Sequence, residues 1–217
     1  MKKILTLFTL LALLIAGGQT TISAQSLTKQ QEKAIQKDVK KRTKELKKAN
    51  WEPLASTQTM EYALLSYRTY IEADPVNRIP VIGIALGQNN KIGRDNAMHA
   101  GITNYAARAK AQVVGKLKSV ASSDANKASQ EEIDRFGEAY ESAVNAKLSS
   151  LVREHFALVR VPKKEGTKEY NVFMSIDETA ARKAREEAAR AAKEQASLGD
   201  LSTVVEEFIG EPVPGDE

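Results

Sequence analysis

The first 24 residues of the chain have the pattern of a cleavable secretory signal peptide, and this pattern decides which part of the sequence has to fold. Lys2 and Lys3 precede an almost unbroken apolar run over residues 4–16, and Ala24 is the small residue that a signal peptidase needs at its cut. A membrane-spanning helix needs about 20 apolar residues, so an uncleaved anchor is the less favoured alternative. We therefore expect cleavage after Ala24 and a periplasmic or outer-membrane-associated protein with no transmembrane segment.

The chain contains no cysteine. A lipid cannot be attached through a cysteine thiol, and no disulfide can hold the fold, although an exported protein could use one. Stability must therefore come from a packed core. Residues 25–217 are enough for one domain with elaborations, or at most two small domains.

Charge is spread unevenly along the chain, although the formal net charge is only +4. That excess is too small to predict a nucleic-acid partner. Residues 25–50 hold nine Lys or Arg and three acids, whereas residues 199–217 hold six acids and no base. The simplest interpretation is two solvated terminal segments. In the alternative, the basic helix makes a peripheral contact with anionic lipid or pairs with the acidic tail.

The N-terminal part of the mature chain is predicted to be helical. Residues 27–49 favour a helix with a thin apolar seam, and residues 50–53 break that helix at Pro53. A second helix is predicted over residues 57–71. Its single apolar face consists of Met60, Ala63, Leu64, Tyr67 and Ile71.

The middle of the chain is predicted to contain a strand and two long helices. A buried strand over residues 79–87 precedes a helix over about 95–120. A further helix opens with a capping box formed by Ser129 and Glu132. Its expected buried stripe consists of Ile133, Phe136, Tyr140, Ala143, Leu148, Leu151 and Val152.

A hairpin and a last helix follow. Strands over residues 157–162 and 169–176 are predicted to surround a turn at Gly166. Asp177 can cap an alanine-rich helix over about 178–197. Gly199 closes that helix, and a proline-containing acidic tail ends the chain.

The predicted fold class is α+β, with about three mainly antiparallel strands packed against long helices and with helical extensions at both ends. The expected division is a signal peptide over 1–24, a helical N-terminal extension over 25–75, an α+β domain over 76–177, a C-terminal helical segment over 178–209 and a disordered acidic tail over 210–217. Three strands leave the sheet edges exposed. Pairing with another copy or another protein would cover them.

The sequence predicts no nucleotide site. Residues 87–94 connect a strand to a helix, where a phosphate loop would lie. Five residues separate the two glycines, and the lysine and hydroxyl that such a loop requires are missing. A weak anion site at the start of the helix, formed by Lys91 and Arg94, is the remaining alternative.

No catalytic or metal site is expected either. His99 and His155 lack a second histidine at metal-ligand spacing, and cysteine is absent. Residues 26–29 match the Ser-x-x-Lys motif of penicillin-recognising enzymes, but the companion motifs are absent, so the match is attributed to chance. We therefore expect no enzyme activity, no cofactor and no bound metal.

The region from residue 83 onward carries a motif of small residues. Its parts are Gly83-Ile84-Ala85-Leu86-Gly87, Asp95-Asn96-Ala97, Ala100, Ala106-Ala107-Arg108-Ala109, Lys116-Leu117, Leu158-Val159-Arg160-Val161 and the strand from Tyr170 to Asp177. This pattern resembles the LPP-twenty lipoprotein family, whose domain also forms part of a flagellar H-ring assembly protein. The resemblance covers about 80–177 and implies no catalytic residues. The chain departs from the lipoprotein pattern because no cysteine follows the signal.

A narrower resemblance covers more of the chain. The lysine-rich residues 29–49, the break at Asn50-Trp51, the segment Thr59-Met60-Glu61 and the last helix over 178–197 are similar to those of a group of exported proteins from gut and oral anaerobes. The role of that group is unknown. The resemblance therefore implies export but no activity.

Two functions from different classes fit the sequence. The favoured one is a non-enzymatic cell-envelope protein that acts as a structural or protein-interaction module, with an envelope protein or a second copy as partner. The alternative is a periplasmic module that binds a small molecule or a glycan. The aromatic candidates for such a pocket are Trp51, Tyr62, Tyr67 and Tyr70. Finding them in the core would count against that alternative.

Overall fold

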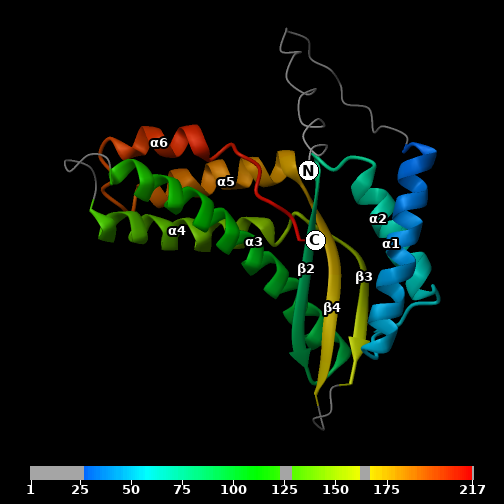
Figure 1. The fold of residues 1–217 in the computed structure, drawn as a ribbon. Helices are drawn as coiled ribbons and strands as arrows, with labels where there is room; N and C mark the ends of the chain where they lie inside the picture. Colours follow the sequence, from blue (N-terminus) through cyan, green and yellow to red (C-terminus); the bar gives the residue numbers. More distant parts are fainter. Residues whose placement is uncertain (1–26, 123–128, 162–166, 217) are drawn as a thin grey trace, which may run out of the picture.

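The computed structural model describes residues 27–122, 129–161 and 167–216, and this part has an α+β fold (Figure 1). Its helices are α1 (Lys29–Lys48), α2 (Met60–Glu72), α3 (Asn90–Ala121), α4 (Gln130–Leu148), α5 (Glu178–Lys193) and α6 (Leu201–Phe208). Its strands are β1 (Glu52–Pro53), β2 (Arg78–Gly87), β3 (Val152–Arg160) and β4 (Lys168–Asp177). They form one antiparallel sheet in the order β1-β3-β4-β2, so β1 and β2 are its edges. The predicted fold class is confirmed, with one strand more than expected.

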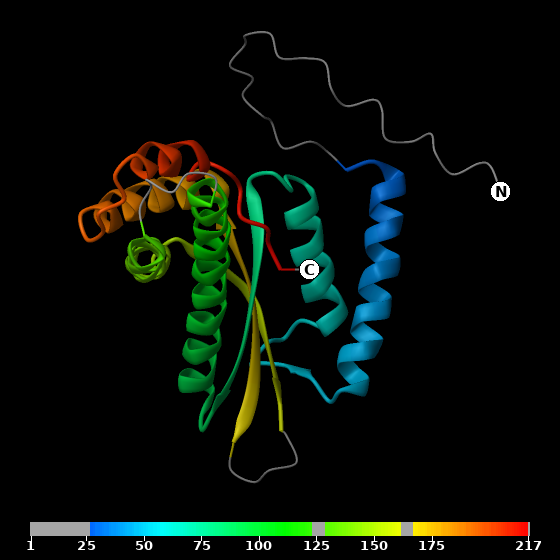
Figure 2. The same cartoon turned by 60° about the vertical axis from the view of Figure 1, so that its left-hand side comes forward.

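Helices cover both faces of the sheet (Figures 1 and 2). α1 and α2 cover one face, where Trp51 and Tyr67 join Leu158 of β3 and Phe173 of β4 in an apolar cluster. α3 crosses the other face and continues beyond the sheet, where α4 and α6 pack against it and α5 packs against α4. That second cluster includes the fully buried Met174 of β4. The sheet is thus shared by two cores, one on each face.

Small residues let β2 and α3 approach closely. Gly83 lies against the backbone of Ala97 and Gly101, and Gly87 lies against Gly93. A Cβ atom on Gly83 would overlap the carbonyl oxygen of Ala97. The two glycines of the Gly-x-Ala-x-Gly pattern are therefore required by the crossing of strand and helix.

Several elements follow the predictions from their local signals. α2 buries all five predicted core residues. Asp177 caps α5 by accepting a hydrogen bond from the N–H of Ala180 at 2.9 Å. Ser129 caps α4 as predicted, but the Glu132 carboxylate accepts hydrogen bonds from the N–H of Ser197 and from a later arginine of the same helix. That carboxylate therefore connects α4 to the segment after α5.

α3 begins at Asn90, five residues earlier than predicted. The reason is Asn89, whose side-chain oxygen accepts a hydrogen bond from the N–H of Ile92 at 3.0 Å and caps the helix. The predicted polar turn over 87–94 is therefore mostly the first turn of α3.

β3 begins at Val152 instead of residue 157. Val152 pairs with Ile176 of β4, and Leu151 is exposed, so the predicted α4 stripe ends at Leu148. β3 and β4 form the predicted hairpin. Its turn at Gly166 and the predicted signal peptide lie outside the described residues.

The predicted helix breaker after α1 forms the extra strand. Asn50 has a φ of 60°, in the left-handed region that asparagine tolerates, and it turns the chain back toward the sheet. Glu52 and Pro53 then pair with Val159 and Leu158 of β3. Proline is tolerated here because β1 is an edge strand.

The predicted helical segment over 178–209 contains two helices. α5 ends at Lys193, and Gly199, with a φ of +53°, lies in the turn that leads into α6. A left-handed conformation of this kind favours glycine.

The C-terminal tail is packed, which corrects the prediction of a disordered tail. Val213 is buried, and the N–H of Asp216 donates to the carbonyl oxygen of Pro80 at 2.9 Å. The Asp216 carboxylate accepts a hydrogen bond from the N–H of Ile82 at 2.7 Å and pairs with Arg108 at 2.5 Å. The tail therefore covers the first part of the β2 edge.

Candidate functional site

Helix α1 has one thin buried seam and a wide exposed surface. Thr28 and Gln31 form a capping box at its start, in which each side chain accepts a hydrogen bond from the backbone N–H of the other. The buried seam consists of Ile35, Val39, Thr43 and Leu46. Because this seam packs into the cluster with α2 and the sheet, it fixes which side of α1 points outward.

All eight lysines of α1 lie on one side of the helix. They are Lys29, Lys33, Lys37, Lys40, Lys41, Lys44, Lys47 and Lys48, and all are exposed. At about 100° per residue, these positions fall within an arc of roughly 120° of the helix surface. The acids Glu32, Asp38 and Glu45 fall outside that arc. We call this surface, the eight lysines of α1, the lysine face.

Within the described part of the chain, no carboxylate forms an ion pair with the lysine face. Outside α1, by contrast, five lysines are paired, namely Lys110, Lys116, Lys118, Lys147 and Lys193. The acidic tail supplies no counter-charge to the lysine face. Glu206 pairs with a lysine of α5, Glu211 pairs with a lysine of α3, and Asp216 pairs with Arg108 of α3. The lysine face therefore has no intramolecular counter-charge among these residues.

The net positive charge of the protein is concentrated on α1. α1 has nine Lys or Arg and three acids, a net charge of +6, whereas the whole chain has +4. The rest of the chain is therefore net −2. A molecule with this separation of charge is oriented by a negatively charged surface, with α1 toward it.

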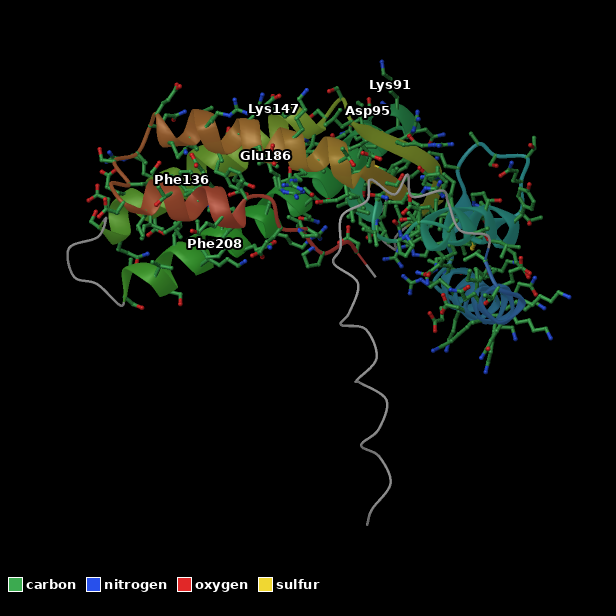
Figure 3. The ribbon with its side chains drawn as sticks, turned by 90° about the horizontal axis from the view of Figure 1, so that it is seen from above. Lys91, Asp95, Phe136, Lys147, Glu186 and Phe208 are labelled. Atoms are coloured by element: carbon green, nitrogen blue, oxygen red, sulfur yellow. The ribbon has the colours of Figure 1, made fainter. Side chains whose placement is uncertain are left out.

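α1 is also the outermost element on its side of the molecule (Figure 2). In the view from above, many side chains of α1 point away from the rest of the protein, at the end opposite the labelled Phe136 and Phe208 (Figure 3). A large partner can therefore approach α1 without contacting the α4–α6 layer.

A groove of about 680 Å³ lies between α1, α2, β2 and the C-terminal tail. Its apolar lining includes Leu64, Tyr67, Ile82 and Phe173. Its carboxylates, from Asp38, Glu45, Glu72 and Asp216, each pair with an arginine. The groove therefore offers a small-molecule ligand an apolar floor and few free acidic groups.

The four candidate aromatics do not gather around this groove. Trp51 and Tyr67 are core residues, 6% and 3% exposed, and the Tyr67 hydroxyl donates to the carbonyl oxygen of Met174. Tyr62 is 57% exposed, and Tyr70 is half-buried beside Arg78. Only Tyr67 lines the groove, which counts against an aromatic binding pocket.

At the start of α3, the arginine of the predicted anion site is paired with a carboxylate. Gly93 packs against the ring of Tyr170, whose hydroxyl donates to the side-chain oxygen of Asn90 at 3.0 Å. Arg94 of the predicted anion site donates from Nε to both carboxylate oxygens of Glu154, at 2.9 and 2.8 Å. Lys91 remains exposed. The Glu154 carboxylate therefore already occupies the anion position at Arg94.

His155 forms a close pair with a serine. Its Nε2 lies 2.8 Å from Ser175 Oγ, and the rings of Tyr67 and Tyr70 pack beside it, with centroids 5.1 and 4.7 Å away. Burial lowers the pKa of His155 to about 4, so the ring is neutral at neutral pH. Ser175 is only 3% exposed, so its hydroxyl cannot reach a substrate. The pair belongs to the packing of the sheet.

A buried charge cluster was missed by sequence reasoning. Arg185 is 1% exposed and donates to Glu178 at 2.6 Å, to the Tyr105 hydroxyl at 2.5 Å and to the carbonyl oxygen of Glu211 at 3.0 Å. Burial is the largest single influence and opposes the charge on Arg185, but the hydrogen bond to Glu178 and the electrostatic attraction of Tyr105, Glu178 and Tyr140 together outweigh it, so the pKa of Arg185 is raised. Burial also raises the pKa of Tyr105 to about 12. The cluster ties α5 to α3 and to the tail.

The only sequence signal for this cluster is spacing. Glu178 and Arg185 are seven residues apart, on the same side of α5 as Ala181, Ala184 and Ala188. A charged pair on the small-residue face of a helix is therefore a candidate for burial.

Within the described residues, no three His, Asp or Glu side chains lie close enough together to hold a metal ion. His99 is exposed on α3, and His155 is on β3. No helix among these residues has the length and apolar composition needed to cross a bilayer.

Comparisons of the chain with protein-family models, curated proteins and solved structures found no match. The resemblance to the LPP-twenty family therefore stays a prediction.

Proposed function

We propose that this chain is an exported, non-enzymatic cell-envelope protein whose lysine face docks it on a polyanionic component of the envelope. The observation that supports this function is the lysine face itself, with eight exposed lysines and no carboxylate partner in the described chain. Like charges on one helix face repel each other and lower helix stability. A surface of mixed positive and negative charges is enough to keep a protein soluble, whereas docking on a polyanion requires a surface that is positive throughout.

The same proposal includes the absence of enzyme activity. It is supported by two observations on groups that could otherwise react or bind. Ser175 is buried beside His155, and Arg94 is neutralised by Glu154. The proposed location is periplasmic or outer-membrane-associated, after removal of residues 1–24.

We propose a second contact, with a protein partner, at the part of the β2 edge that the tail leaves open. Ile84 and Leu86 are 50% and 55% exposed there, and Ile92 of α3 is 48% exposed. The tail covers Pro80 and Ile82 on the same edge. An open edge strand with exposed apolar side chains can accept an extended segment of an envelope protein or of a second copy.

The alternative, a module for a small molecule or a glycan, would use the groove beside α2. It is the weaker candidate because Trp51 and Tyr67 belong to the core and because each groove carboxylate is matched by an arginine. A glycan site would need free polar groups that converge on one ligand.

In-cell photocrosslinking tests the proposal. A photoreactive amino acid replaces Lys37 on the lysine face, Ile84 on the open edge, or Lys183 as a control. Lys183 is exposed on α5 and has no ion pair in the described chain. The proposal predicts envelope adducts from position 37, one defined protein adduct from position 84 and few adducts from position 183. Equal yields from positions 37 and 183 would contradict docking through α1.

A further inference from the structure

We infer that the polyanion met by the lysine face is the surface of a bilayer rich in anionic phospholipid, on which α1 lies flat. This inference rests on the proposed docking function and names its partner. The contact would be with headgroups alone, made by one side of one helix.

The shape of the lysine face suits a large flat partner. A helix of 20 residues is about 30 Å long, and its outer side is convex. The eight lysines run along that whole length, from Lys29 in the first turn to Lys48 in the last. A convex row of charges cannot enclose a small anion, but it can lie against an extended negative surface.

The composition of the face restricts the kind of contact. Besides the lysines, the arc of roughly 120° contains only Gln30. Without an aliphatic or aromatic side chain, the face cannot insert into the acyl region of a bilayer. For the same reason it offers no ring on which nucleic-acid bases could stack.

The choice of lysine over arginine points the same way. Arg42 is the single arginine of α1, and it lies outside the arc, paired with Glu45. Arginine makes bidentate contacts with individual phosphates and carboxylates, as a specific protein or nucleic-acid site requires. Lysine is a point charge on a flexible stem, which suits a diffuse layer of mobile headgroups.

The rest of the molecule favours a defined orientation. After removal of residues 1–24, with Lys2 and Lys3, it is net −4, so an anionic surface repels it while attracting α1. α1 lies at the outer side of the protein (Figure 2), so docking leaves the open part of the β2 edge accessible. The same protein could then hold a second partner beside the bilayer.

The strength of the contact follows from the number of lysines near the surface. Each contributes about 1 kcal/mol close to an anionic leaflet, so the loss of three should weaken binding about 100-fold. The attraction should also fall as salt shortens the screening length from about 10 Å at 0.1 M to about 3 Å at 1 M.

The test is vesicle co-sedimentation of the full chain, with phosphatidylcholine vesicles and with vesicles containing 30% phosphatidylglycerol. The face variant is Lys33→Gln, Lys37→Gln and Lys44→Gln. The control variant, Lys91→Gln, Lys168→Gln and Lys183→Gln, loses the same charge from exposed lysines elsewhere. Any contribution of the apolar residues 4–16 is common to all variants and shows on neutral vesicles.

The inference predicts that binding to the anionic vesicles exceeds binding to the neutral vesicles, and that this excess is weakened about 100-fold by the face variant and less than threefold by the control variant. Equal losses in the two variants would overturn both the inference and the proposed function. If wild-type protein binds heparin through the lysine face but not the anionic vesicles, the bilayer is the wrong partner. In that case docking by α1 still stands.

Discussion

Gly83 of β2 and Ala97 of α3 meet backbone to backbone, with no room between them for a single methyl group. This contact helps to set the distance between the sheet and α3. α4 and α6 pack against α3, and α5 packs against α4. Gly83 therefore helps to determine, together with Gly87, how the helical layer is placed over the sheet.

The change Gly83→Ala should lower the free energy of unfolding by about 3 kcal/mol, because the new methyl group would push two backbones apart. Gly115→Ala is the matched control. Gly115 lies on the same helix α3, and the place that its new methyl group would take has no other atom within 4 Å, so alanine there should stabilise by about 0.5–1 kcal/mol. Urea unfolding of both variants measures the difference. Similar small effects at the two positions would contradict the close crossing.

Arg185→Met should destabilise the protein by about 3–5 kcal/mol, because it leaves the buried Glu178 carboxylate without its partner. The double change with Glu178→Leu should cost less than the single change, since no buried charge then remains unpaired. A double-mutant cycle from denaturant unfolding provides the measurement. Additive costs would show that the two residues do not act as a pair.

Asp216→Ala should free the β2 edge from the tail. The change removes the acceptor of the Ile82 N–H and the partner of Arg108, at a cost of about 1–2 kcal/mol. Hydrogen exchange of the Ile82 amide should speed up. The control Asp200→Ala should change stability by less than about 0.5 kcal/mol, because its exposed carboxylate makes no capping bond. Unchanged exchange at Ile82 in Asp216→Ala would contradict the packed tail.

Stability should fall as the pH is lowered from about 6.5 to about 4. Burial lowers the pKa of His155 to about 4 in the folded state, whereas an unfolded histidine has a pKa of about 6.5. Between these values the unfolded state binds more protons, so acid favours unfolding. Water partly screens this half-buried ring, so the contribution should be about 1–2 kcal/mol.

The comparison of His155→Gln with His99→Gln isolates this effect, because His99 is exposed. Unfolding at pH 7 and at pH 4.5 should show a smaller acid loss in His155→Gln and the wild-type loss in His99→Gln. A wild-type loss in both variants would assign the acid sensitivity to other groups.

The elements that sequence reasoning predicted well carry local signals. α2 has one clean apolar face, α5 has Asp177 at its cap, and β2 is a short β-branched run. The missed features depend on distant partners. Pro53 marks a break in the local sequence and becomes a strand only through pairing with β3. Acids and prolines suggest a loose tail, but Asp216 is held by Arg108, 108 residues away in the chain.

The candidate site was visible in the sequence only as a density of lysines. The arrangement of the lysines in one arc, with no acid among them, follows from helical geometry once the buried seam is known. The lack of counter-charges could not be predicted, because it depends on where the acidic tail packs. Arg185 shows the opposite error, since its charge-rich helix suggests solvent while Glu178 and Tyr105 allow its burial.

Salt extraction of isolated envelopes tests docking through the lysine face most directly. Wild-type chain, the variant at Lys33, Lys37 and Lys44, and the control variant at Lys91, Lys168 and Lys183 are each expressed in the same cells. Wild-type and control protein should sediment with the envelope at low salt and be released as salt rises. The lysine-face variant should be soluble already at low salt. A lysine-face variant that sediments and is released like the wild type would contradict docking through α1.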